Sequence, residues 1–183
     1  MKHLSVAAAL LGLSSLASAQ VMVVNQAISQ AEVEAAQQAW CRALVDISTT
    51  HERSGQAAAK ALAEKVIDSA YGYQMGAVLF KPTLTVNPQT FRTTRAGALA
   101  YFVGGDAAFP KDKGFALKGW TACQPVNSAI FLAGDSATSM GKVNITNKDG
   151  KVTTVDKTWQ YVKDDAGKLR IVVHHSSLEY AGL

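Results

Sequence analysis

The chain has 183 residues, of which 48% are hydrophobic and 17% are charged, and its formal net charge is +4. This length and composition suit a single domain with one substantial core. No basic run is dense enough to indicate nucleic-acid binding, whereas the mild positive balance is compatible with a small anionic ligand.

The first residues, "MKHLSVAAALLGLSSLASAQ", have the form of a secretory signal. An apolar stretch runs from Leu4 to Leu16, and Ala17-Ser18-Ala19 matches a signal-peptidase site. The apolar stretch is shorter than the roughly 20 residues that a membrane-spanning helix needs. We therefore predict a signal peptide over residues 1–19, cleavage between Ala19 and Gln20, and a secreted or periplasmic protein that no longer contacts a membrane.

The mature chain is expected to begin with a flexible lead-in over residues 20–28, followed by a single domain over residues 29–183. Ser29 and Glu32 have the spacing of a capping box, and apolar residues follow them at helical intervals. These features predict a first helix, which the stretch "STTHERSG" is expected to end.

A second helix is predicted from about Gln56 to Tyr73. Its apolar stripe includes Tyr73, whereas Tyr71 falls on the more polar side, so Tyr73 is expected to point inward. The next segment, "AVLFKPTLT", predicts a short extended piece that Pro82 ends. A short helix is then predicted over Arg95–Val103, with Thr93 or Thr94 as its cap and two glycines at its end.

From Phe115 onward the sequence favours strands, because it is rich in Val, Ile, Thr and aromatic residues. The turns "NKDG" and "DDAG" are typical of hairpins. Helices followed by a meander of antiparallel strands predict an α+β domain, with the helices on one side of a curved sheet. The strands are expected near residues 119–124, 127–133, 136–146, 151–163 and 168–177.

Histidine and cysteine side chains are the most common metal ligands and redox groups in proteins. The mature chain has three histidines, His51, His174 and His175, and neighbouring side chains on a strand point to opposite faces. A catalytic zinc needs about three protein ligands, and no spacing here supplies them. The two cysteines, Cys41 and Cys123, are compatible either with a disulfide or with two buried thiols.

Nucleophilic catalysis is poorly supported, because no G-x-S-x-G motif is present and sequence neighbours on a strand make poor partners. What remains is a pocket of neutral hydrogen-bonding groups that could orient a small molecule and a water. Each hydroxyl also has an ordinary structural explanation, in the core, at a turn or at a strand end. The candidates are Tyr73, Thr83, Tyr101 and one alternation of "HHSS", that is His174 with Ser176 or His175 with Ser177.

The alternation of the last strand leaves two possibilities for the side that faces the pocket. Leu169, Ile171 and Val173 share a face with His175 and Ser177, and this is the more apolar of the two sets. We therefore favour His175 and Ser177 as the pocket pair. A bulge near the strand end would instead turn His174 and Ser176 inward.

The assembled segments resemble the iota-class carbonic anhydrases, which are related to the association domain of calcium/calmodulin-dependent kinase II. The resemblance covers roughly Ala35 to Tyr180, although many relatives have proline where this chain has Glu179. The combination of these segments is specific to the family, whereas no single segment is. The segments that carry it are "VLFKPT", "FRTT", "GALAYFVGG", "FPKDKGFAL", "MGKVNIT" and "HHSSLEY".

The resemblance implies a cone-shaped fold like that of nuclear transport factor 2, a homodimer, and reversible hydration of carbon dioxide to bicarbonate and a proton. It implies that Thr83, Tyr101 and a serine of "HHSS" hold bicarbonate, with a histidine beside them. Members are described with and without a metal; the ligand count favours no cofactor and leaves zinc or manganese as options. The alternatives are a non-catalytic oligomerisation or anion-binding module, and a hydrolase or isomerase for a larger substrate.

Overall fold

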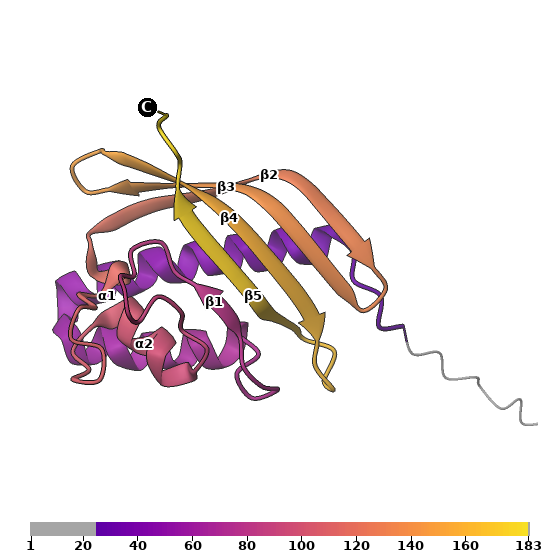
Figure 1. The fold of residues 1–183 in the computed structure, drawn as a ribbon, viewed down its shortest axis with the longest axis horizontal. Helices are drawn as coiled ribbons and strands as arrows, with labels where there is room; N and C mark the ends of the chain where they lie inside the picture. Colours follow the sequence, from indigo (N-terminus) through magenta and orange to yellow (C-terminus); the bar gives the residue numbers. More distant parts are fainter. Residues whose placement is uncertain (1–24, 183) are drawn as a thin grey trace, which may run out of the picture.

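The computed structural model describes residues 25–182, so the predicted signal peptide and its cleavage site lie outside the described residues. Figure 1 shows a curved sheet that arches over a long helix, with a shorter helix at one end. The elements are α1 (Gln30–Ala70), β1 (Leu79–Lys81), α2 (Arg95–Val103), the 3-10 helix η1 (Phe115–Leu117), β2 (Trp120–Ala133), β3 (Ser136–Asn147), β4 (Val152–Lys163) and β5 (Leu169–Leu178).

The predicted start of the first helix is confirmed. The Ser29 side chain accepts from the Glu32 backbone, and the Glu32 carboxylate accepts from the Ser29 N–H at 2.8 Å. Just before this cap, Ile28 is buried and its N–H donates to the Gly134 carbonyl, so the end of the lead-in is tied to the sheet.

The two predicted helices form α1, which is interrupted only at Gly55, where φ is +77°. The residues before Gly55 in "STTHERSG" stay helical, so the expected break over this whole stretch was wrong. Glycine tolerates positive φ without a steric penalty, and one such residue is enough to kink a helix. The second part of α1 ends at Ala70, before the tyrosines that the sequence placed within it.

The sheet has the order β1-β5-β4-β3-β2, and only the β1–β5 pair is parallel. β2 is one continuous strand, although the sequence suggested two pieces around Pro125. Proline is tolerated there because β2 is an edge strand and its backbone nitrogens need not all donate. The strands near the C-terminus and the short helix α2, capped by Thr94, confirm the predicted α+β architecture.

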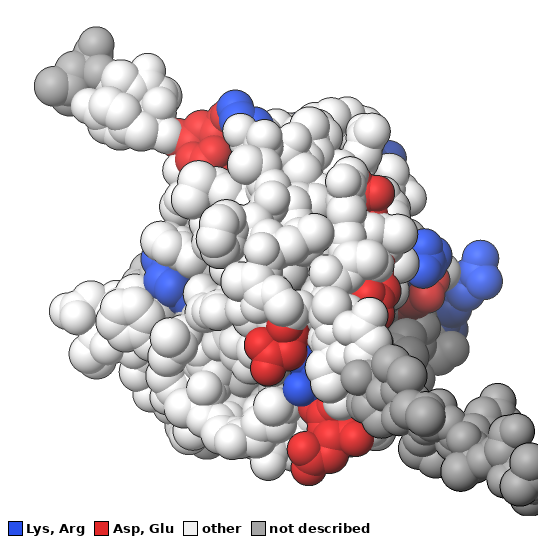
Figure 2. Space-filling model, turned by 90° about the vertical axis from the view of Figure 1, so that its right-hand side faces the viewer, with Lys and Arg blue, Asp and Glu red and all other residues white. Residues whose placement is uncertain are grey.

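A disulfide joins Cys41 on α1 to Cys123 on β2, with 5.1 Å between the Cα atoms. The sequence left this pairing open, and the fold brings the two cysteines together because α1 packs across the edge strand. No helix within residues 25–182 is long and apolar enough to cross a membrane. The face in Figure 2 carries scattered charges on a mostly uncharged surface, in keeping with the low charged fraction of the chain.

Candidate functional site

A β-bulge in β5 decides which polar residues point inward. Trp159 pairs with His174 and Gln160 with Val173, but Tyr161 pairs with Ile171, so Val172 is an extra residue on β5. An extra residue reverses the alternation beyond it. His174 and Ser176 are therefore each only 1% exposed on the inner face.

The preference for His175 and Ser177 as the pocket pair was thus wrong, and the physical reason is this bulge. His175 is exposed and Ser177 is partly exposed. Both line a surface hollow of about 370 Å³ on the outer face of the sheet, together with Met140 and Asp156.

Two hydroxyls meet at the junction of β1 and β5. The Thr83 Oγ1 and Ser176 Oγ atoms are 2.6 Å apart, and the Lys81 ammonium donates to the Ser176 carbonyl at 3.0 Å. Pro82 ends β1 just before Thr83, because proline cannot continue the ladder. The parallel pairing of Lys81 with His175 sets the register that brings the two hydroxyls together.

Tyr101 adds a third hydroxyl from α2. Its side chain is 4% exposed, and its oxygen has no hydrogen-bond partner among residues 25–182. Burial raises the pKa of Tyr101, while contacts with the Leu84 backbone and with Thr83 act in the opposite direction. A buried hydroxyl without a partner is uncommon and costly, so this proton is available to a ligand beside Thr83.

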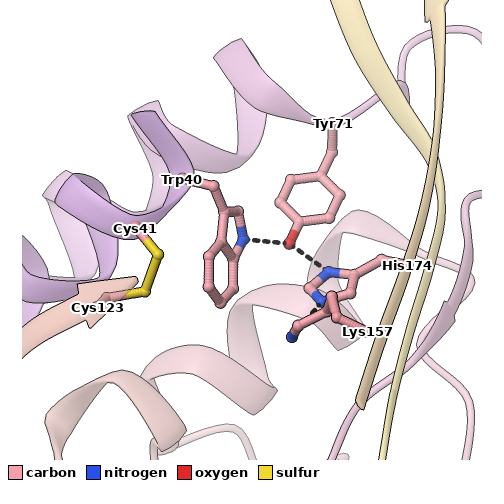
Figure 3. The surroundings of a disulfide bond; sticks show 6 residues. All are labelled: Trp40, Cys41, Tyr71, Cys123, Lys157 and His174. Atoms are coloured by element: carbon pink, nitrogen blue, oxygen red, sulfur yellow. Dashed lines mark hydrogen bonds between the residues drawn. A yellow bond between two sulfur atoms is a disulfide. The ribbon is translucent and has the colours of Figure 1, made fainter. Parts of the chain in front are cut away.

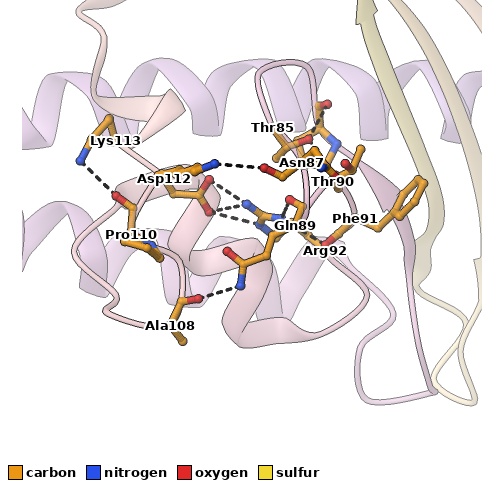
Figure 4. Close-up of polar contacts among 12 residues, drawn as sticks. Thr85, Asn87, Gln89, Thr90, Phe91, Arg92, Ala108, Pro110, Asp112 and Lys113 are labelled. Carbon is orange, nitrogen blue, oxygen red and sulfur yellow. Dashed lines mark hydrogen bonds and ion pairs between the residues drawn. The ribbon is translucent and has the colours of Figure 1, made fainter.

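A cavity of about 230 Å³ opens at Tyr101, and its wall includes three lysines, Lys111, Lys113 and Lys118. The loops that form this wall are held by a buried ion pair between Arg92 and Asp112 at 2.8 Å (Figure 4). Because Asp112 is already paired with Arg92, the lysines give the cavity a positive character that suits a small anion.

A second set of polar side chains occupies the interior beside this cluster. The Trp40 indole donates to the Tyr71 hydroxyl at 3.0 Å, and that hydroxyl lies 2.8 Å from His174 Nδ1. His174 Nε2 lies 3.0 Å from the Lys157 Nζ atom, so both ring nitrogens have protein partners (Figure 3). Burial, followed by the nearby Lys157 and His175, holds the pKa of His174 well below its ordinary value.

The prediction that Tyr73 points inward while Tyr71 faces outward was wrong for Tyr71. The helix ends at Ala70, so the helical periodicity used for the prediction no longer applies to either tyrosine. Tyr71 is fully buried, whereas the partly buried Tyr73 donates its hydroxyl proton to the Arg92 carbonyl at 2.8 Å. Tyr73 therefore has its hydroxyl in use away from the Thr83–Ser176 pair.

Sequence reasoning missed Lys157 and Tyr71 as members of the interior. A signal for Lys157 was present, because Val155, Trp159 and Tyr161 share its alternation on β4 and are all buried. A lysine on the face of a strand that is otherwise apolar and buried is unusual, so this pattern identifies Lys157 as a candidate for a functional role.

Among residues 25–182, no three His, Cys, Asp or Glu side chains come together as metal ligands. His51 lies on α1, and His174 uses both nitrogens on other partners. The site is therefore a set of hydroxyls, with an aromatic and amine-containing interior beside it. Together with the curved sheet over α1, this defines an α+β domain of the nuclear-transport-factor-2-like class with a polar site at the end of β1.

Comparisons with known proteins narrow this class to one family. The family model described as metal-independent carbonic anhydrase matches residues 31–178. A metal-independent carbonic anhydrase from Nostoc sp. (strain PCC 7120) is 64% identical over 168 residues, which are 92% of this chain and 82% of that protein. The chain belongs to the metal-independent carbonic anhydrase family.

Solved structures agree with the family and with the fold. The iota-carbonic anhydrase from a cyanobacterium, complexed with bicarbonate, is 65% identical with a TM-score of 0.87, over 90% of this chain and 100% of that one. A putative calcium/calmodulin-dependent protein kinase II association domain from Xanthomonas campestris is 26% identical with a TM-score of 0.53, over 88% and 100%. The resemblance inferred from the sequence is thereby confirmed, and a non-catalytic module is not favoured.

Proposed function

We propose that the carbonic anhydrase reaction of this chain, the reversible hydration of carbon dioxide to bicarbonate and a proton, takes place at Thr83, Ser176 and Tyr101. The observation that carries this proposal is that three buried or partly buried hydroxyls gather at the end of β1. Thr83 and Ser176 lie 2.6 Å apart, and Thr83 also acts on the pKa of Tyr101, whose hydroxyl has no partner among the described residues.

The hydroxyls have to replace what a metal does in other enzymes of this activity. A bound metal lowers the pKa of water from 15.7 to about 7, and nothing among these side chains does so directly. Instead, the hydroxyls orient a water toward the carbon of carbon dioxide and donate to the oxygen on which negative charge develops. A well-aimed donor of this kind contributes about 2.7–4 kcal/mol to the transition state.

The cavity at Tyr101 also supports this site assignment, because its lining suits the product, bicarbonate. Bicarbonate is a small anion with three oxygens that accept hydrogen bonds, and Lys111, Lys113 and Lys118 line the cavity next to Tyr101. Positive charge at the mouth of a cleft concentrates anions there and steers them inward.

The sequence led us to expect that a histidine accepts or relays the proton. His174 does not suit the first of these roles at neutral pH, because its pKa lies well below the ordinary value and both nitrogens are engaged. His175 lies on the outer face of the sheet. The proposal therefore assigns His174 to the framework behind the hydroxyls.

The site assignment predicts different effects for two neighbouring serines. Ser176→Ala removes an inner hydroxyl, and a hydrogen bond to a charged group contributes about 1.5–3 kcal/mol, so kcat/KM should fall roughly 10- to 100-fold. Ser177→Ala, one residue along on the outer face, is the matched control and should keep the rate of the unchanged chain. Stopped-flow carbon dioxide hydration measures both, and equal rates for the two variants would relocate the site.

The same assay tests the activity itself and its independence of metal. The purified chain should hydrate carbon dioxide at the same rate before and after exhaustive treatment with a chelator. A folded chain without activity would overturn the enzymatic proposal. Activity that is lost on chelation and restored by zinc or manganese would overturn only metal independence for this chain.

Export and dimerisation are further parts of the proposal. The signal-like N-terminus and the Cys41–Cys123 disulfide both support an oxidising compartment outside the cytoplasm. Exposed apolar side chains on the sheet, Phe131 and Met140 among them, support a homodimer through this surface. A mature N-terminus other than Gln20 in mass spectrometry would contradict the cleavage site, and a purely monomeric sedimentation profile would contradict the dimer.

A further inference from the structure

Lys157 is a fully buried lysine that forms no ion pair among residues 25–182. Its side chain is 4% exposed, and its Nζ atom lies over the rings of Trp40 and Trp159, at 4.7 and 5.3 Å from their centroids. Buried lysines without a carboxylate partner are rare, because desolvation penalises the charged form. Burial accordingly lowers the pKa of Lys157 to about 7.

The position of Lys157 connects it to the proposed site. In the β4–β5 ladder, Lys157 lies directly opposite Ser176, and both side chains point to the inner face. Its Nζ atom contacts the ring of His174, which is two residues before Ser176 on the same face. Phe80 stacks on that ring with centroids 4.4 Å apart, so the imidazole is fixed between β1 and β4.

The direction of the hydrogen bonds follows from counting donors. The Trp40 indole can only donate, so the Tyr71 oxygen accepts from it. Tyr71 has one proton, and His174 Nδ1 at 2.8 Å is its acceptor. If Nδ1 donated to Tyr71 instead, the Tyr71 proton would be buried without a partner among the described residues, which is costly.

With Nδ1 as an acceptor, neutral His174 carries its proton on Nε2. That proton points at Lys157 Nζ, 3.0 Å away, and a nitrogen can accept it only as a neutral amine with a lone pair. The chain of donors therefore runs in one direction, from Trp40 through Tyr71 and His174, and ends on Lys157 (Figure 3).

We propose that Lys157 is a positioning residue of the carbonic anhydrase site, which as a neutral amine accepts the Nε2 proton of His174 and fixes the tautomer and orientation of that ring behind Ser176. The link to turnover rests on the proposed function, whereas the tautomer does not. Small displacements of groups at a site lower the rate strongly, so a misplaced His174 slows the reaction through Ser176.

This arrangement depends on pH in a definite direction. Below a pH of about 7 the amine is protonated, loses its lone pair and no longer accepts from His174, so activity falls as pH decreases through this value. None of the other titratable groups on the elements around it forms an ion pair with its amine, and no carboxylate among the described residues shares its face of the sheet. On the inner side they are Tyr71, Tyr161 and His174, and on the outer face Lys81, Lys142, Asp156 and His175.

Two substitutions at Lys157 test the need for a lone pair. Lys157→Met removes the amine, and Lys157→Arg keeps a cation that cannot accept a proton. Partners that orient a functional histidine through its second nitrogen contribute about 10- to 100-fold in metal sites, and we expect at least about a tenfold loss of kcat/KM in both variants. The rise in activity with pH near 7 should also disappear in both.

The matched control is Lys163→Met, at the other end of β4, where the lysine pairs with Glu32 at 3.0 Å. This variant should keep both the rate and the pH profile of the unchanged chain. Wild-type activity with an unchanged profile in Lys157→Arg would overturn the proposal, because a charge alone would then be sufficient.

Nitrogen NMR of the unchanged chain tests the same inference without any substitution and without an activity assay. At pH 9, ¹⁵N-labelled His174 should show a protonated Nε2 and an unprotonated Nδ1, and the Lys157 Nζ should titrate near pH 7. A proton on Nδ1, or a Lys157 pKa at its ordinary value, would overturn the proposal even if the enzyme is active. An inactive chain with the expected spectra would overturn only the proposed function.

Discussion

At the scale of single residues, Tyr101 shows a conflict between stability and function. Its hydroxyl is buried without a partner among residues 25–182, and such a group costs about 1–3 kcal/mol of stability. Tyr101→Phe should therefore leave the free energy of unfolding unchanged or raise it. The same change removes a proposed donor to bicarbonate, so kcat/KM should fall on the order of 100-fold. Thermal unfolding and stopped-flow hydration measure the two effects.

Tyr161 provides the control for this prediction. Its hydroxyl is also buried without a partner in the described part of the chain, but the residue lies among Trp40 and Ile171, apart from Thr83 and Ser176. Tyr161→Phe should keep or raise stability and leave turnover unchanged. If both phenylalanine variants lost activity equally, the effect could not be assigned to a donor at Tyr101.

The sequence could identify the residue types of the candidate site but not the register of the last strand. Thr83 and Tyr101 were predicted from their motifs, and the structure brings Thr83 together with Ser176. The choice of His175 over His174 failed because alternation assumes an uninterrupted ladder, whereas Val172 is unpaired. A bulge arises from packing of β5 against its neighbours, and a single sequence holds no local signal for it.

At the scale of elements, a bulge also shapes the edge strand. Ser128 is an extra residue on β2, because Asn127 pairs with Gly141 and Ala129 with Met140. The bulge brings Asn127 to Gln37 on α1, and the two amides exchange hydrogen bonds of 2.8 Å. Gly141 permits this close approach, since a Cβ there would clash with the Val126 carbonyl and lie 2.8 Å from the Asn127 Cα.

Gly141→Ala should therefore destabilise the protein through a clash with backbone atoms that cannot move as a side chain can. Overpacking of this kind costs about 1–3 kcal/mol, and we expect the upper part of this range. Gly134→Ala is the comparison, because a Cβ there meets nothing within 4 Å and only the positive φ is penalised, by roughly 1–2 kcal/mol. Denaturant unfolding compares the two, and a larger loss in the Gly134 variant would contradict the packing argument.

For the helices, too, the sequence predicted the features that depend on nearby residues and missed those that depend on tertiary packing. The capping box at Ser29 and a cap at Thr93 or Thr94, which the structure places at Thr94, were predicted because they depend on residues three positions apart. The extent of the helix through "STTHER" was not, because it depends on a distant contact: Ser48 is buried and its hydroxyl accepts from the Trp120 N–H at 2.7 Å. Tertiary packing overrides weak propensity in such stretches.

At the scale of the whole molecule, the order of elements was sufficient to predict an α+β domain with helices against a curved antiparallel sheet. The parallel addition of β1 beside β5 was not predictable from order alone, although it is what places Thr83 against Ser176. The covalent link between α1 and β2 was also open, because the distance between two cysteines depends on the completed fold.

That link leads to a prediction for the molecule as a whole. The Cys41–Cys123 disulfide spans 82 residues and ties the long helix to the edge strand of the sheet. Removing such a cross-link typically lowers the free energy of unfolding by about 2–4 kcal/mol, because the unfolded chain gains freedom. The Cys41→Ala/Cys123→Ala variant should therefore unfold at a temperature lower by roughly 5–15 °C.

The folded double variant should still hydrate carbon dioxide, because neither sulfur belongs to the proposed site. Reductant should lower the melting temperature of the unchanged chain toward that of the variant and should leave the variant itself unaffected, which controls for other effects of the reagent. Equal melting temperatures for the oxidised chain and the variant would show that packing of α1 on β2 stabilises this edge without the cross-link.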